Sequence, residues 1–166
     1  METPLGAFTL LVDGDAVRGA GFTADVDEMI RIAGVDPATV RREGELVDDG
    51  HPAVAAVKAY FDGDLQAIDK VEVVDRPRVG PFTQAARHAL RAIPAGTTLT
   101  YTQLAVEAGN GRAIRAAGAA CASNPVALIV PCHRVVRTDG TLGGFLYGLE
   151  IKERLLAYEA EAGVGD

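Results

Sequence analysis

The 166-residue sequence lacks the features typical of secreted and membrane proteins. Its two cysteines, Cys121 and Cys132, are too few for a disulfide framework. No apolar run approaches the roughly 20 residues that a membrane-spanning helix needs. The stretch Met1–Leu11 has no basic start of the kind found in export signals, and Asp13 ends its apolar run. We therefore expect a cytoplasmic protein with reduced cysteines and no membrane partner.

Residues that bind metals and nucleotide cofactors are scarce as well. The two cysteines and three histidines (His51, His88 and His133) show no paired ligand spacing, which argues against structural zinc. No glycine-rich loop follows a strand-like run, so neither a dinucleotide nor a SAM-type cofactor is indicated. The sequence predicts no metal site and no cofactor.

Charge is distributed unevenly along the chain. The net charge is −7, but residues 1–75 contain 6 Lys or Arg against 16 Asp or Glu, whereas residues 76–166 contain 10 against 7. Only the second half favours contact with phosphate groups. The alternative interpretation is a well-solvated acidic surface that binds no partner.

Turn residues and apolar spacing divide the first half into short elements. Asp13-Gly14-Asp15 suits a tight turn between two strands. The pattern predicts strands over Ala7–Val12, Ala16–Phe22 and Val71–Val74, helices over Asp25–Ala33 and Pro52–Phe61, and a loop over Pro37–Asp49. Two prolines and a glycine in Arg76–Pro81 indicate a linker. We therefore predict one domain at 1–75, a linker at 76–81 and a second domain at 82–166.

The second half shows a helix-turn-helix signature. Thr100 and Gln103 have the spacing of a capping box, which starts a helix that runs to about Ala108. A second helix is expected from about Arg112 to Ala122, after the turn Gly109-Asn110. Helices over Thr83–Ala92 and Leu149–Ala160 complete the prediction.

The second helix of this pair has almost no large side chains. It is either a helix packed closely on the core or a recognition helix that approaches a DNA groove, with Arg112 and Arg115 as its projecting side chains. The helix-turn-helix context favours nucleic acid.

A cysteine and a histidine follow the longest apolar run of this half. Val126–Val130 reads as a short buried strand that Pro131 stops, and Cys132, His133 and Arg134 come next. A thiolate is a nucleophile, and a neighbouring imidazole or guanidinium favours that form. The alternative is a buried, inert cysteine, which is how we interpret Cys121.

The segment Asn124–Val136 resembles the active-site motif of the O6-alkylguanine-DNA alkyltransferases, also called methylated-DNA–protein-cysteine methyltransferases. The resemblance extends through Tyr101–Ala105, Arg115–Gly118 and Leu155–Glu159, and it is strong over Phe82–Ala162. It implies an α+β fold, with an N-terminal ribonuclease-H-like α/β support domain and a mainly helical C-terminal domain of the winged helix-turn-helix type.

The resemblance also implies an irreversible DNA repair reaction. The damaged base is flipped out of the duplex, and Cys132 takes the alkyl group from O6-alkylguanine, with O4-alkylthymine as a second candidate substrate. The implied partner is double-stranded DNA that carries O6-alkylguanine. The protein would act as a monomer, once, with no cofactor and no required protein partner.

The family's residue roles carry over to matching positions of this sequence. By resemblance His133 takes the thiol proton through a water, Glu159 orients His133, Asn124 braces the cysteine turn and Tyr101 assists the leaving guanine. Arg115 would enter the base stack in place of the flipped base. The other residues that the resemblance places on the DNA or in the pocket are Arg112, Ala116, Gly118, Arg134, Val135, Phe145 and Leu146.

Some positions depart from the family pattern. Ala86-Arg87 stands where the family usually has Val-Trp, Ile114 replaces a smaller residue, and Phe145 replaces the common tyrosine. Two other functions are weighed. The first is a DNA-damage sensor of the same fold that binds alkylated guanine without transferring the alkyl group. Such sensors have another residue in place of the reactive cysteine, so the presence of Cys132 argues against this function. A cysteine hydrolase would need an oxyanion-hole glycine motif before Cys132, and none is found.

Overall fold

The computed structural model describes residues 1–38, 50–76 and 78–163. The chain divides into two compact units: the first comprises Met1–Pro77 with Pro125–Ile129, and the second comprises Arg78–Asn124 with Val130–Asp166. Most of the predicted loop (residues 39–49) and Pro77 of the predicted linker lie outside the described residues. The α+β fold class is confirmed, but the sequence did not predict that five residues ahead of Val130 belong to the first unit.

The first unit is built on an antiparallel hairpin. Strands β3 (Thr9–Asp13) and β4 (Ala16–Gly21) pair as predicted around the turn at Gly14, whose φ is 59°. Strands β1 (Glu2–Thr3) and β2 (Gly6–Ala7) form a second, shorter pair.

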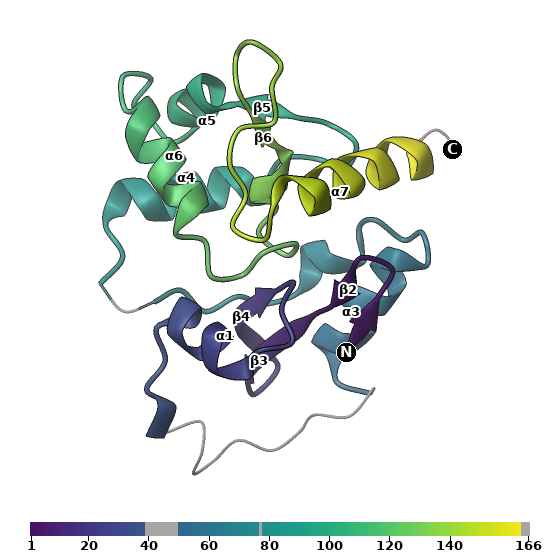
Figure 1. Ribbon diagram of the computed structural model, residues 1–166. Helices are drawn as coiled ribbons and strands as arrows, with labels where there is room; N and C mark the ends of the chain where they lie inside the picture. Colours follow the sequence, from purple (N-terminus) through teal and green to yellow (C-terminus); the bar gives the residue numbers. More distant parts are fainter. Residues whose placement is uncertain (39–49, 77, 164–166) are drawn as a thin grey trace. The chain divides into compact units, whose positions relative to one another are not determined.

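The described part of this unit also contains the helices α1 and α3, labelled in Figure 1, and a 3-10 helix. Helix α1 (Val26–Ala33) begins at Asp25, whose side chain accepts a hydrogen bond from Glu28 N, and ends at Gly34 in the left-handed conformation. It packs against β3 and β4, which buries its apolar face. Helix α3 spans Pro52–Phe61 as predicted, and the 3-10 helix η1 spans Ala67–Lys70.

Two predicted strands are wrong. Val71–Val74 forms a single parallel bridge, Val73 to Val17. The run 126–130 contributes one bridge, Val126 to Ala20, and then turns, with Leu128 at a φ of 72°. A continuous apolar run shows only that a segment is buried, and buried turns share this property with buried strands. A positive φ is incompatible with a strand ladder.

The second unit packs three helices together: α4 (Pro81–Arg91), α5 (Tyr101–Glu107) and α6 (Ile114–Ala122) (Figure 1). The predicted capping box is present, since Gln103 N donates to Thr100 Oγ1 and Thr100 N donates to Gln103 Oε1. The helix-turn-helix pair is therefore confirmed, but α6 begins two residues later than expected.

Shorter elements place the cysteine segment beside this bundle. Strands β5 (Leu99–Thr100) and β6 (Val135–Val136) form a parallel pair, and the 3-10 helix η2 (Cys132–Arg134) leads directly into β6. Helix α7 (Leu149–Ala162) packs against η2.

The described ranges of the chain contain neither a membrane-spanning helix nor a cluster of metal-binding side chains. No helix there has both the length and the apolar character needed to cross a membrane. No group of three or more His, Cys, Asp or Glu side chains in those ranges is arranged to hold a metal ion.

Candidate active site

Cys132 lies at the start of η2 with its thiol held by an amide. Asn124 Nδ2 donates to Cys132 Sγ at 3.2 Å and to Val130 O at 2.7 Å, so one side chain fixes both the sulfur and the backbone before it. Cys132 is 7% exposed and Asn124 is 3% exposed. The predicted bracing role of Asn124 therefore has a geometric basis, although the cysteine follows a turn and not a strand.

The surroundings of the Cys132 thiol have opposing effects on its pKa. Burial raises the pKa of Cys132 above its ordinary value, and the Asn124 hydrogen bond and the positive charges of Lys152 and Arg87 oppose that rise. With burial the largest effect, the resting group is the thiol, so a nearby base is needed to make the nucleophilic thiolate.

His133, Arg134 and Glu159 form a buried cluster. Glu159 Oε1 lies 2.9 Å from His133 Nε2 and accepts from Arg134 Nη2 at 2.8 Å, while Glu159 Oε2 accepts from Arg134 Nε at 3.0 Å. Gly96 N donates to the same carboxylate at 3.1 Å. Burial alone would raise the pKa of Glu159, but the hydrogen bonds and charges of His133 and Arg134 hold it well below its ordinary value.

The cluster determines where the imidazole carries its proton. Burial lowers the pKa of His133, and the opposing pull of Glu159 is weakened because Arg134 already compensates that carboxylate. His133 is therefore neutral near pH 7. An ionised carboxylate only accepts hydrogen bonds, which assigns the proton to Nε2 and leaves a lone pair on Nδ1. Nδ1 is buried and has no hydrogen-bond partner among the described residues, so it is available as a base.

Of the arginines that the resemblance places on the DNA or in the pocket, Arg134 lies in η2 and Arg112 in the turn before α6. Arg134 is 1% exposed, and its guanidinium binds Glu159 and Ile93 O, so it is part of the buried cluster and is not a DNA contact. Arg112 is exposed but precedes α6, because the helix begins at Ile114. Asn110 Oδ1 accepts from Arg112 N and holds this residue in the turn before the helix.

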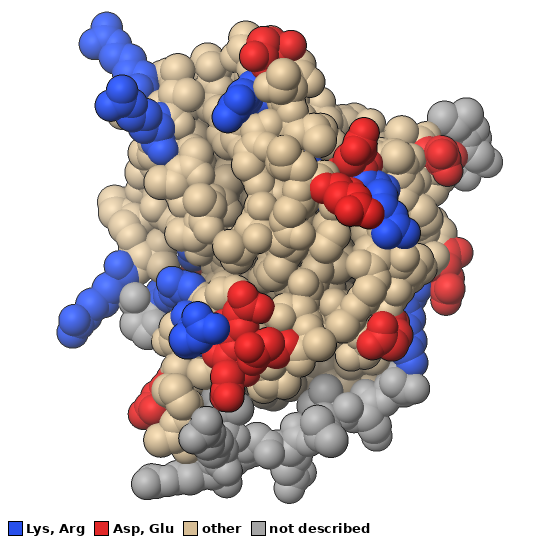
Figure 2. Space-filling view, viewed as in Figure 1, with Lys and Arg blue, Asp and Glu red and all other residues tan. Residues whose placement is uncertain are grey.

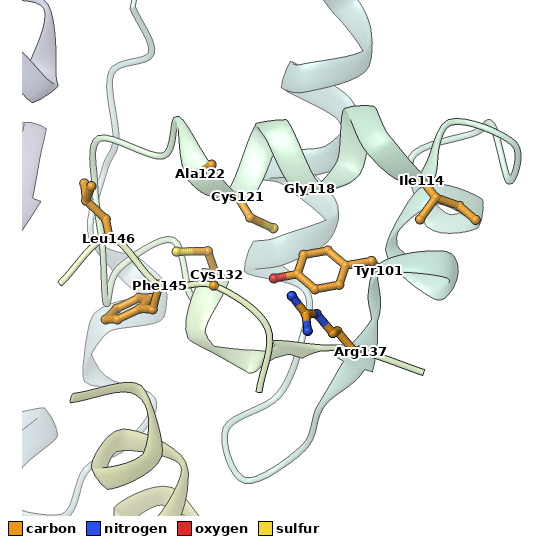
Figure 3. A pocket seen from close by; sticks show the side chains of 10 residues that line it. Tyr101, Ile114, Gly118, Cys121, Ala122, Cys132, Arg137, Phe145 and Leu146 are labelled. Atoms are coloured by element: carbon orange, nitrogen blue, oxygen red, sulfur yellow. The ribbon is translucent and has the colours of Figure 1, made fainter. Parts of the chain in front are cut away.

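A cavity of about 460 Å³ opens onto Cys132 in the second unit. Four of its lining residues were predicted from the sequence, namely Tyr101, Gly118, Phe145 and Leu146, and Figure 3 shows the Tyr101 hydroxyl pointing toward Cys132. The remaining lining residues are Ile114, Cys121, Ala122, Arg137 and Gly144. Val135 is fully buried in β6 and does not line the cavity.

Close packing fixes the Tyr101 wall of this cavity. A Cβ on Gly143 would lie 2.8 Å from Tyr101 Oη, and the φ of Gly143 is 71°, so both space and backbone conformation require glycine there. Burial raises the pKa of Tyr101, which keeps its hydroxyl protonated at neutral pH.

Cys121 shares the cavity with Cys132 without sharing its chemistry. Burial raises the pKa of Cys121 to about 12. No side-chain hydrogen bond to its sulfur is found in the described part of the chain. Our interpretation of Cys121 as an inert thiol is compatible with this environment, although its place in the cavity wall was not predicted.

Similar proteins with assigned names align with this chain over nearly its whole length. Residues 81–161 match the family model "6-O-methylguanine DNA methyltransferase, DNA binding domain". The methylated-DNA–protein-cysteine methyltransferase of Methanosarcina acetivorans is 45% identical over 158 residues, which cover 95% of this chain and 94% of the relative. The enzyme of the same name from Salmonella typhimurium is 37% identical over 163 residues, with 96% and 92% covered.

The chain belongs to the methylated-DNA–protein-cysteine methyltransferase family.

Solved structures of methylated-DNA–protein-cysteine methyltransferase type agree over the whole chain. Mycobacterium tuberculosis O6-methylguanine methyltransferase superposes with a TM-score of 0.79 at 30% identity, covering 100% of this chain and 93% of that one. Mycobacterium tuberculosis OGT in complex with DNA gives a TM-score of 0.77 at 31% identity, covering 98% and 91%.

One buried residue of this methylated-DNA–protein-cysteine methyltransferase family member was missed by sequence reasoning. Lys152 on α7 is fully buried, and its Nζ donates to Val135 O at 2.6 Å, to Gly144 O at 3.2 Å and to Leu142 O. It therefore ties the cavity loop to β6. A signal existed, because Lys152, Leu155 and Glu159 have the i, i+3, i+7 spacing of a single helix face.

Proposed function

We propose that this protein repairs double-stranded DNA by transferring the alkyl group of O6-alkylguanine irreversibly to Cys132. The observation that carries the proposal is the placement of the Cys132 thiol in a cavity whose wall includes residues of α6. The next residue in the sequence, His133, has a buried Nδ1 without a hydrogen-bond partner among the described residues. We propose that it acts as a monomer in the cytoplasm, without a cofactor or a protein partner, and O4-alkylthymine is a second candidate substrate.

The reaction follows from the protonation states of the site. The Cys132 proton passes through a water to His133 Nδ1, and Glu159 stabilises the imidazolium that forms. The thiolate attacks the alkyl carbon, so a carbon–sulfur bond forms and the carbon–O6 bond breaks. Guanine leaves with the bonding electron pair and takes up a proton, for which we assign the Tyr101 hydroxyl in the cavity wall as the donor.

The product explains why one protein molecule would act once. The sulfur becomes a thioether, which has no acidic proton and no ready leaving group. The Asn124 amide and the neutral His133 stabilise or create a thiolate and have no means of removing an alkyl group from it. Repair therefore consumes the protein in a one-to-one ratio.

The surface of α6 supports a role in holding duplex DNA. Arg115 and Ala116 are exposed on this helix, and Gly118 is half-buried above the cavity. In the space-filling view, basic side chains project around the start of α6 and no acidic side chain is seen beside them (Figure 2). Small residues allow close approach to the groove, and Arg115 fills the stack that the flipped base leaves.

The test is the mass of the intact protein after reaction with a duplex that contains O6-methylguanine. We expect one added methyl group per molecule, located on Cys132 by peptide mapping and absent in Cys132→Ala. Cys121→Ala is the matched control and should still be methylated, because the high pKa of Cys121 makes it a poor nucleophile. Tight binding of the lesion duplex without any adduct would overturn the proposal and favour a damage sensor.

A further inference from the structure

Among the described residues, Arg137, which follows β6, is the only charged side chain in the wall of the Cys132 cavity. Arg137 is an exposed residue, so its side chain is in contact with solvent as well as with the cavity. In Figure 3 the guanidinium and the Tyr101 hydroxyl extend from the same side of the cavity toward Cys132.

The guanidinium has no carboxylate partner in the part of the chain that the structure describes. The nearest acidic residue along the chain, Asp139, is hydrogen-bonded to Thr141, since its Oδ1 accepts from Thr141 N at 3.0 Å and from Thr141 Oγ1 at 2.7 Å. The Thr141 hydrogen bonds are the main cause of the lowered pKa of Asp139, and the charge of Arg137 contributes less. The cavity wall therefore carries one positively charged side chain that forms no ion pair in the described part of the chain and interacts only at longer range with the carboxylate of Asp139.

The chemistry of the ligand limits what this charge can meet. The other side chains of the wall are uncharged, which suits a neutral alkylated base. In DNA the anionic groups are the phosphates, and a guanidinium matches two phosphate oxygens with parallel hydrogen bonds. A nucleotide whose base occupies the cavity carries its phosphates at the edge of the cavity.

We propose that Arg137 binds a phosphate flanking the flipped nucleotide and so holds the alkylated base against Cys132. This inference rests on the proposed DNA repair function and adds to it a residue that neither the cysteine motif nor the helix-turn-helix pair contains. Arg137 is thus a specificity-determining residue, because it favours a base that is part of a DNA strand over the same base free in solution.

The experiment compares Arg137→Gln with the unaltered protein on three alkyl donors. These are a duplex with O6-methylguanine, the same duplex with uncharged methylphosphonate linkages on both sides of the lesion, and free O6-benzylguanine. We expect Arg137→Gln to slow transfer from the first duplex about tenfold, since a charge-assisted contact is lost. The dependence of the rate on salt should become shallower by about one unit in the log–log slope.

The other two donors supply the controls. With free O6-benzylguanine the two proteins should react at equal rates, and with the methylphosphonate duplex both should be slow, with no further loss from the substitution. Arg137→Lys should recover part of the rate because it keeps the charge. Arg31→Gln, an exposed arginine of α1 in the first unit, should behave as the unaltered protein.

Three results would overturn the inference: equal loss on the duplex and the free base, a full additional loss on the methylphosphonate duplex, or no loss on any donor. Failure of the proposed function gives a different result, because the unaltered protein would then acquire no alkyl group on Cys132 from any of the three donors.

Discussion

Helix α7 carries two buried charges on one face, and each is satisfied by groups outside the helix. Lys152 donates to three backbone carbonyls, and Glu159 accepts from His133, Arg134 and Gly96 N. Buried charges are tolerated only with such complete pairing. The same helix thereby fixes the cavity loop at one end and orients the imidazole at the other.

Replacing Lys152 by Met should destabilise the protein. Methionine keeps the apolar stem but leaves the carbonyls of Val135, Leu142 and Gly144 without their donor. We expect the free energy of unfolding in urea to fall by about 3 kcal/mol, the cost of buried acceptors left unsatisfied. Lys70→Met, at an exposed position of η1, should change it by less than about 0.5 kcal/mol. A loss no larger than that of the control would contradict this account.

Among individual residues, the sequence predicted those site residues that belong to a recognisable motif. Cys132, His133 and Asn124 belong to one continuous segment, and Glu159 follows at a position matched to a family pattern. The resemblance placed Arg134 on the DNA or in the pocket, and only the fold shows that it compensates Glu159. Arg137 has no local signal, since its importance comes from the cavity that distant segments form around it.

Among the elements, α5 has the clearest start. Thr100 and Gln103 satisfy each other's backbone N–H groups, and the next residue after Thr100 is Tyr101, whose hydroxyl faces the cavity. A defined helix start therefore also defines the position of a residue assigned to the chemistry.

Thr100→Ala should reduce the free energy of unfolding by about 1 kcal/mol, the usual effect of losing an N-cap side chain. Thr102→Ala is the matched control, because Thr102 is exposed within the same helix and has no capping contact; it should change stability by less than about 0.5 kcal/mol. Thermal unfolding of both variants gives the comparison. Equal losses in the two variants would show that the cap contributes nothing.

Elements whose ends are marked by capping residues, glycine or proline were predicted well. Elements that depend on tertiary contacts were not. Asp25 and Gly34 bound α1, and Pro52 starts α3, so their ends follow from backbone preferences. In contrast, the bridges at Val73 and Val126 depend on partners on β4, which no nearby residue identifies. The start of α6 was misplaced because Arg112 has good helix propensity while Asn110 holds it in a turn.

For the molecule as a whole, the buried cluster predicts sensitivity to acid. The pKa of His133 is lowered below 6.5, so the stability it contributes is present above about pH 6.5 and is lost as the pH falls below that value. The pKa of Glu159 is lowered from 4.5, so its contribution is present above about pH 4.5 and is lost in stronger acid. Both groups therefore act in the same direction.

The free energy of unfolding should fall between pH 7.5 and pH 5.5 because of His133, with the loss setting in below about pH 6.5. Urea unfolding across this range, compared between the unaltered protein and His133→Gln, isolates this contribution, since the variant lacks the titrating group. His88→Gln, at an exposed site on α4, should keep the slope of the unaltered protein. An identical slope in His133→Gln would refute the assignment of a neutral, buried imidazole.

The five residues Pro125–Ile129 have a consequence for the order in which the protein is made. They belong to the first unit, and the residues on either side of them, Asn124 and Val130, belong to the second. Val126, Leu128 and Ile129 are almost fully buried. During synthesis the first unit therefore cannot complete its core until Ile129 has left the ribosome, when α6 has already been made and Cys132 is only three residues behind. The first unit thus completes its core only when most of the second unit has already been synthesised.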